Sequence, residues 1–223
     1  MANPVAKSQS FNIVIIGQAN RLQYEAVLFA ASLRHNRPDF AGRLFVATPR
    51  ENDLWSKSPT LRNTAVIELL ESLGAEIIPF DTPEFGEGYP YGNKIQALLA
   101  LPEGEPFVFF DTDTLVLDDL GRVPFDFDRP GASQKVDGTW PKIELYGPGY
   151  TQTWKSLYDK FGLEFESTLD LEQPDEFWKR YMYFNAGYFF YRCPREFGTR
   201  FLDYATQIRD NAPEELVCQP LWP

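Results

Sequence analysis

Two acidic residues separated by one position, Asp111 and Asp113, stand directly after the apolar run Phe107–Phe110. In an extended chain, residues i and i+2 point to the same side, so both carboxylates can be directed at one point. Carboxylate oxygens suit Mg²⁺ or Mn²⁺, and such an ion can stabilise a diphosphate as a leaving group. The alternative is that the two residues cap a turn or the next helix. Apolar residues on both sides, at 107–110 and 115–117, favour the cation site.

The pair needs a strand to hold it at the edge of a sheet. In open α/β sheets, ligands bind beyond the carboxyl ends of the strands. The run Phe107–Phe110 ends where Asp111 begins, so it places the pair at that edge. Asp118 and Asp119 come too late in the chain to join this cluster, and we expect them in a solvated turn.

Hydrophobic periodicity predicts the elements around that strand. Up to residue 110, strands alternate with helices through short links, which indicates an α/β class with a single, mainly parallel, Rossmann-like sheet flanked by helices. In the segment 181–192, we expect Asn185 to be buried between apolar neighbours and therefore hydrogen-bonded. We expect one domain over residues 1–223, because no repeat or linker interrupts the chain. The predicted strands cover residues 11–17, 43–48, 75–80, 106–110, 131–136 and 181–192, and the predicted helices cover 22–34, 60–73, 91–101, 150–161 and 194–210.

Composition narrows the classes of partner. The 223 residues carry a formal net charge of −11, which argues against nucleic acid as the main partner because phosphate binding needs a basic surface. The two cysteines, Cys193 and Cys218, form neither a disulfide framework nor a zinc motif and fit a reducing compartment. The sequence shows neither a signal peptide nor an apolar run long enough for a membrane span. We therefore expect a cytoplasmic protein.

Two segments together resemble a known enzyme family. The sequence FVFFDTDTLVLDDL at 107–120 is similar to the D-x-D segment of A-type glycosyltransferases. The sequence YFNAGYFFYR at 183–192 resembles the F-N-[AS]-G strand of retaining glycosyltransferases of the family 8 and glycogenin group. The spacing of the two segments and the Asn93-Lys94 helix ahead of the first are also similar. This resemblance covers roughly residues 11 to 205 and implies the nucleotide-diphospho-sugar transferase (GT-A) fold.

The resemblance also implies roles for individual residues. Asp111 and Asp113 would hold Mn²⁺ (or Mg²⁺) and the donor diphosphate, and with Asn185 they form the expected catalytic set. Asn185 and Gly187 would line the sugar pocket, while the turn from Gly17 to Arg21 would lie against the nucleobase and ribose. The expected partners are a nucleotide-sugar donor, which we take to be a UDP-sugar, and an unknown saccharide, lipid or protein acceptor. The full set of expected substrate-binding residues is Asn93, Lys94, Gly17, Thr112, Ala186 and Gly187.

The sequence also departs from the family pattern near its end. Family members carry an Asp-Gln pair after the F-N-A-G strand and later a histidine that completes the metal site. Here no Asp precedes Gln219, and the only histidine is His35, for which we expect a surface or core role in the first helix. The third metal ligand is therefore unrecognised, and the ending Leu221-Trp222-Pro223 favours truncation at the C-terminus.

Two alternatives to glycosyl transfer stay open at this point. The missing Asp and His leave room for a domain that binds a nucleotide sugar or a protein partner without turnover. A nucleotidyltransferase shares the sheet and the metal-binding carboxylates, but it would show a glycine-rich, basic loop after the first strand. The segment GQANRLQ at 17–23 has only one glycine and one arginine, which favours a glycosyltransferase over a nucleotidyltransferase.

Overall fold

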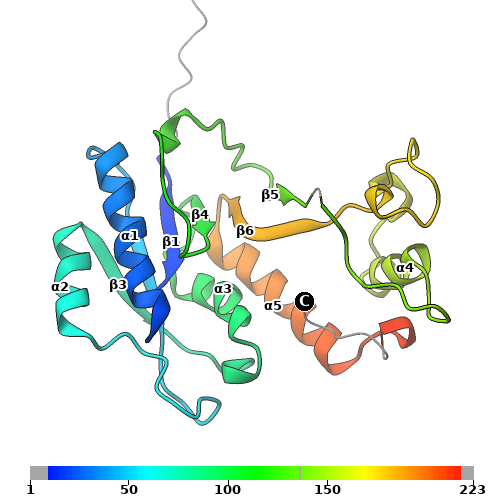
Figure 1. Cartoon of the computed structure of the whole chain (residues 1–223), viewed down its shortest axis with the longest axis horizontal. Coiled ribbons are helices and arrows are strands. Elements are labelled where there is room, and N and C mark those ends of the chain that lie inside the picture. Colours follow the sequence, from blue (N-terminus) through cyan, green and yellow to red (C-terminus); the bar gives the residue numbers. More distant parts are fainter. Residues whose placement is uncertain (1–9, 136, 217–223) are drawn as a thin grey trace, which may run out of the picture. The chain divides into compact units, whose positions relative to one another are not determined.

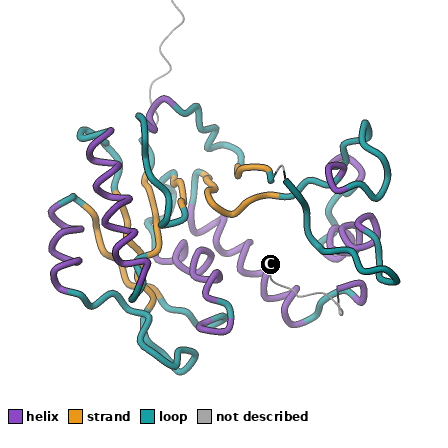
Figure 2. Tube along the Cα trace, viewed as in Figure 1, coloured by secondary structure: helices purple, strands orange, loops and turns teal. Residues whose placement is uncertain are grey.

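The computed structural model describes residues 10–135 and 137–216 of the chain (Figure 1). The predicted order of strands and helices is confirmed, with most boundaries within a few residues of the expected ones. Figure 2 shows the same elements by type of secondary structure. The strands are β1 (Asn12–Ile16), β2 (Leu44–Pro49), β3 (Ala75–Phe80), β4 (Phe107–Phe110), β5 (Gly131–Gln134) and β6 (Phe184–Tyr191), and the α-helices are α1 (Arg21–Asn36), α2 (Thr64–Ser72), α3 (Asn93–Gln96), α4 (Tyr150–Lys160) and α5 (Pro194–Asp210).

The strands form one sheet in the order β3-β2-β1-β4-β6-β5. Strand β1 pairs in parallel with both β2 and β4, and β2 pairs in parallel with β3. Strand β6 joins antiparallel to β4, with Phe107 opposite Tyr191 and Phe110 opposite Tyr188. The sheet is therefore mainly parallel, as predicted, and the carboxyl ends of β1, β2, β3 and β4 share one edge.

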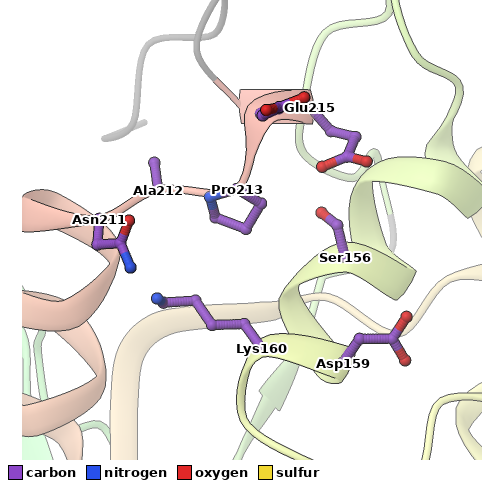
Figure 3. Close-up of a pocket in the computed structure, with 8 residues that line it drawn as sticks. Ser156, Asp159, Lys160, Asn211, Ala212, Pro213 and Glu215 are labelled. Atoms are coloured by element: carbon purple, nitrogen blue, oxygen red, sulfur yellow. The ribbon is translucent and has the colours of Figure 1, made fainter.

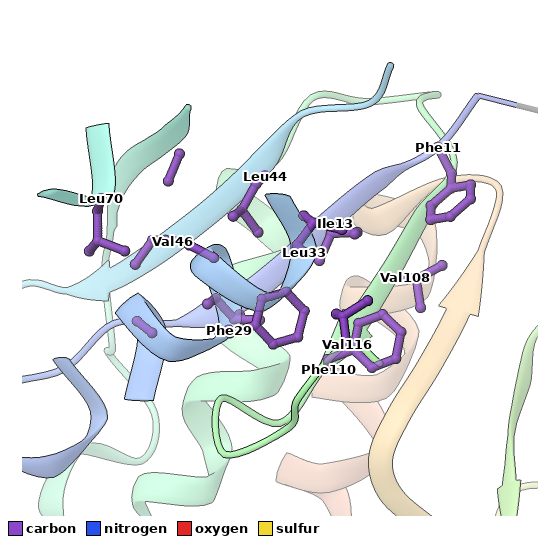
Figure 4. Close-up of a cluster of buried hydrophobic side chains, with 14 of the residues drawn as sticks. Phe11, Ile13, Phe29, Leu33, Leu44, Val46, Leu70, Val108, Phe110 and Val116 are labelled. Atoms are coloured by element: carbon purple, nitrogen blue, oxygen red, sulfur yellow. The ribbon is translucent and has the colours of Figure 1, made fainter. Parts of the chain in front are cut away.

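Both faces of the parallel strands are buried, and successive residues of β4 serve opposite faces. On one face, Val108 and Phe110 join a cluster with Phe29 and Leu33 of α1 (Figure 4). On the other face, Phe109 stacks on Phe189 with ring centroids 4.7 Å apart, and Phe189 in turn stacks on Phe197 of α5 at 5.3 Å. This two-sided burial explains why β4 is apolar throughout. Asp111 is the first residue after the strand.

Two predicted helices are shorter than expected. Helix α2 begins at Thr64 with Asn63 as its N-cap rather than at Thr60, because Thr60 forms a β-bridge with Gln18. The predicted helix over 91–101 is divided into α3 and two 3₁₀ turns, Pro90–Gly92 before it and Ala97–Ala100 after it. Leu101, which follows the second turn, is extended.

The expected burial of Asn185 is wrong. Phe184, Asn185 and Ala186 are all exposed. The pairing of β6 with β4 covers Tyr188–Tyr191, so these three residues precede the part of the strand that pairs with β4. An exposed amide carries no cost of burial, and the argument for Asn185 therefore rests on the family resemblance alone.

The chain divides into two compact units. The first contains residues 10–131 and 187–199, and the second contains the described residues of 132–186 and 200–216. In the second unit, Trp154 of α4 packs between Trp140 and Tyr183, with ring centroids 6.0 and 5.9 Å apart.

The described residues also answer three smaller expectations. Cys193 is a buried free thiol, whereas Cys218 and Gln219 lie outside the described residues. His35 is exposed in the last turn of α1, which agrees with a surface role. Across residues 10–135 and 137–216, no helix combines the length and the apolar character that crossing a bilayer requires.

Candidate functional site

The acidic pair lies in a turn that leaves the carboxyl end of β4. The amide of Thr114 donates to the carbonyl of Asp111 at 3.1 Å, which closes the turn. The amide of Asp111 donates to the carbonyl of Gly187 at 2.7 Å, which extends the pairing with β6 by one step. The extended conformation assumed from the sequence is thus wrong at Thr112 and Asp113, which form the turn. Asp111 is half-buried, Thr112 is buried and Asp113 is exposed.

The two carboxylates are nevertheless close enough to interact. Burial raises the pKa of Asp111 above its ordinary value, and the negative charge of Asp113 raises this pKa further. The hydrogen bond and positive charge of Lys94 act in the opposite direction and lower the pKa of Asp111. A carboxylate whose ionisation is disfavoured by burial and by an acidic neighbour forms a site that a cation would stabilise.

Lys94 provides the positive charge that the structure itself places there. It projects from α3, and its Nζ lies 2.6 Å from Oδ1 of Asp111. The same ammonium group faces the rings of Tyr91 and Phe109, each with its centroid 5.9 Å away. The structure therefore brings together Lys94, Asp111 and Asp113, three of the residues that the sequence predicted.

A divalent cation fits this pair on the chemistry of its ligands. Mg²⁺ is commonly held by one or two carboxylates, with phosphate oxygens and water completing its coordination. Asp111 and Asp113 supply two such carboxylates. Across residues 10–135 and 137–216, no group of three or more His, Cys, Asp or Glu side chains could hold an ion. Oxygen atoms of a bound diphosphate would complete the coordination of the ion.

Three residues expected to bind substrate also have structural partners. The hydroxyl of Thr112 is bonded to the backbone of Ile16, so only the backbone of Thr112 remains for a ligand. Gly17 is buried, and a Cβ there would lie 2.3 Å from Cγ1 of Val46, so packing against β2 requires the glycine. Asn93 is buried, and its Nδ2 donates to Oε1 of Gln18 at 3.0 Å.

The contacts of Ile16 and Gln18 with the site were not predicted from the sequence, which placed Ile16 only in a strand and Gln18 only in the turn from Gly17 to Arg21. The two residues hold Thr112 and Asn93, which are 96 and 75 positions away in the chain. A local pattern cannot reveal contacts over such distances. Gln18 offers one signal, because a polar amide follows the buried strand at the edge where ligands bind.

The expected residues of β6 fall in different units. Gly187 lies in the first unit, where its carbonyl accepts the hydrogen bond from Asp111. Asn185 and Ala186 lie in the second unit, at the exposed start of the strand. The proposed role of Asn185 in the sugar pocket therefore remains a prediction from the resemblance.

The second unit has a surface pocket of about 400 Å³ (Figure 3). Lys160 of α4 and Asn211, which follows α5, both line it, together with the acidic residues Glu214 and Glu215. None of the predicted site residues lines this pocket. We therefore assign the site to the turn after β4, not to the pocket.

Substitutions of the two charged neighbours of Asp111 should move its pKa in opposite directions. Asp113→Asn removes a negative neighbour and should lower the pKa of Asp111, whereas Lys94→Met removes a positive neighbour and should raise it. Titration of the Asp111 carboxyl carbon by NMR measures both shifts. Shifts in the same direction would show that the two neighbours do not act on one carboxylate.

The same pKa makes folding stability depend on pH. Because the folded-state pKa of Asp111 is raised, its ionised form is disfavoured by folding. Its contribution to the free energy of unfolding therefore falls as the pH rises from below the ordinary pKa through the raised one. In Lys94→Met this fall should extend to higher pH. Denaturant unfolding as a function of pH measures the difference between the variant and the parent.

Comparison with known proteins identifies the family of the chain and its fold. A family model described as a Rhodobacterales glycosyltransferase domain matches residues 13–223. No curated protein sequence matches the chain at a significant level.

Two solved structures of LgtC share the fold. An active-site mutant of LgtC has a TM-score of 0.56 at 16% sequence identity, over 95% of this chain and 68% of LgtC. The galactosyltransferase LgtC in complex with donor and acceptor sugar analogs has a TM-score of 0.52 at 18% identity, over the same shares of the two chains. At these identities the likeness shows the fold, which is the predicted GT-A fold.

Proposed function

The chain belongs to the Rhodobacterales glycosyltransferase family, and on this basis we propose that it transfers a sugar from a UDP-sugar donor with a divalent cation at Asp111 and Asp113. The observation that carries the proposal is the ion pair between Lys94 and Asp111, beside Asp113 at the carboxyl edge of the sheet. That edge is where α/β sheets bind their ligands. Family membership favours glycosyl transfer over nucleotidyl transfer.

The charges at this edge suit a diphosphate leaving group. The bond between the anomeric carbon and the diphosphate oxygen breaks, and its electron pair leaves with the diphosphate. Lys94 offsets the negative charge that develops there, and a bound cation supplies further positive charge. The Lys94 side chain is only 18% exposed, so little water screens its charge.

The acceptor hydroxyl then forms the new bond to the anomeric carbon. By resemblance to the retaining group, we propose that it attacks on the face that the diphosphate leaves, so that the anomeric configuration is retained. Its proton passes to an oxygen of the departing diphosphate, which balances the charges without an enzymic base. Asn185 and Gly187 are proposed to contact the donor sugar.

Titration with UDP tests the proposal directly. We expect the protein to bind UDP in isothermal calorimetry when Mn²⁺ is present and to bind it far more weakly in excess EDTA. Incubation with UDP-glucose and UDP-galactose in Mn²⁺ should then release UDP through slow transfer to water. GDP serves as the control for the base.

Three outcomes would contradict parts of the proposal. Equal binding of UDP with and without metal would show that nucleotide binding does not use a cation at this site. Binding without release of UDP from either sugar would favour the non-catalytic alternative for these donors. Tighter binding of GDP would assign a different base.

A further inference from the structure

Thr112, the residue between the two carboxylates, makes two hydrogen bonds to a single residue of β1. Its Oγ1 donates to the carbonyl oxygen of Ile16 at 2.8 Å and accepts from the amide nitrogen of Ile16 at 3.2 Å. The Thr112 side chain is buried, at 5% exposure, while its neighbour Asp113 is exposed. The middle of the D-x-D segment is therefore attached to the sheet, and one carboxylate beside it faces solvent.

The position of this contact explains why a hydroxyl is needed. The backbone register between β1 and β4 runs from Asn12 and Phe107 to Val14 and Phe109. Ile16 lies two residues beyond the end of that register. A buried amide and a buried carbonyl both need partners there, and a hydroxyl can accept from one and donate to the other. Valine has the same shape but could do neither.

A second contact ties the lysine to the same end of β1. Asn93, which precedes Lys94, donates to Gln18 at 3.0 Å, and Gln18 lies two residues after Ile16. The segment Ile16–Gln18 thus holds the acidic turn through Thr112 and holds α3 through Asn93. Both partners of the Lys94–Asp111 ion pair are anchored to this one segment.

We propose that Thr112 is a positioning residue for the metal–nucleotide site. Its hydroxyl holds the turn at 111–114 against β1, so that Asp111 stays within reach of Lys94 and beside Asp113. The inference rests on the proposed function, because the position of the turn matters only for the binding of a metal–nucleotide complex. Residues that orient metal ligands typically change metal affinity by about 10- to 100-fold when they are replaced.

Replacing Thr112 by valine and by serine tests the inference. Thr112→Val keeps the volume and removes both hydrogen bonds, and we expect the affinity for Mn²⁺ in the presence of UDP to fall by about tenfold or more. Thr112→Ser keeps the hydroxyl and should bind Mn²⁺ nearly as well as the parent. Calorimetry at fixed UDP measures the affinity, and hydrogen exchange by NMR measures the protection of the Ile16 amide, which should be lost only in Thr112→Val.

Thr82→Val is the matched structural control. Thr82 is also fully buried, and its Oγ1 accepts hydrogen bonds from Trp55 and Asn52. It follows β3, an edge strand that is separated from β4 by β2 and β1. Thr82→Val should lower the melting temperature without changing the affinity for Mn²⁺. An equal loss of affinity in Thr82→Val, or parent-like affinity in Thr112→Val, would overturn the inference.

Failure of the proposed function would be visible separately. If the parent binds no Mn²⁺–UDP complex, the proposed function fails, and hydrogen exchange alone then decides the role of Thr112. Parent-like protection of the Ile16 amide in Thr112→Val would show that the hydroxyl does not hold the turn. Loss of protection of the Ile16 amide in Thr112→Val, with parent-like protection in Thr112→Ser, would show that the hydroxyl holds the turn against β1.

Discussion

Replacing Asp113 by alanine is expected to abolish the Mn²⁺-dependent binding of UDP while leaving the fold intact. Asp113 is exposed, and its charge disfavours the ionised form of Asp111. Its removal should therefore change the free energy of unfolding by no more than about 0.5 kcal/mol. Loss of one of two carboxylate ligands should weaken Mn²⁺ binding by about 100-fold or more, beyond the effect of an outer partner. Calorimetry with UDP and Mn²⁺ and denaturant unfolding measure the two quantities.

Asp118→Ala is the matched control for this prediction. Asp118 is an acidic residue of the same segment, 79% exposed at its side chain, and it pairs with Arg122 at 3.3 Å. Its removal changes the net charge by the same amount, so any effect of overall charge on Mn²⁺ binding would appear in both variants. If Asp113→Ala binds Mn²⁺–UDP as well as Asp118→Ala does, the cation site is wrongly assigned.

The sequence could predict the sheet because its strands are defined by local signals. The run Phe107–Phe110 is apolar at every position, since α1 covers one face of β4 and aromatic rings of β6 and α5 cover the other. Such a strand can be recognised from its composition alone. The two acidic residues that follow it could then be placed at the carboxyl edge from chain order.

Contacts between distant segments account for most of what the sequence could not predict. The start of α2 was placed too early because Leu61 continues the apolar pattern, yet Thr60 pairs with Gln18 and the amide of Leu61 donates to Thr48. These partners satisfy backbone groups outside the helix. Helical periodicity carries no information about them.

The roles of individual site residues depend on the same kind of contact. Thr112 and Gly17 were themselves expected to bind substrate, and nothing in their spacing shows that they connect neighbouring strands. Their partners, Ile16 and Val46, were recognised only as members of strands. The place of the acidic pair after β4 was thus predictable from the sequence, whereas the contacts that Thr112 and Gly17 make with other strands required the fold.

Replacing Lys94 by methionine should lower the turnover number by about 10²- to 10³-fold, the effect of removing a group that stabilises developing charge. Methionine keeps an apolar stem against the rings of Tyr91 and Phe109 and removes only the ammonium group. Binding of UDP through the cation should persist, because Asp111 and Asp113 remain. Release of UDP from a UDP-sugar measures turnover, and calorimetry measures binding.

The same variant should bind Mn²⁺ more tightly when no nucleotide is present. In the structure, Nζ of Lys94 lies 2.6 Å from Oδ1 of Asp111, so a cation must compete with the ammonium group for that carboxylate. A donor diphosphate offers the ammonium group new partners, and the competition ends once it binds. The control is Lys155→Met, which removes an ammonium paired with Asp159 at 3.0 Å on α4. Turnover should fall, and the affinity for Mn²⁺ without nucleotide should rise, only in Lys94→Met. Parent-like values of both quantities in this variant would show that Lys94 is not part of the site.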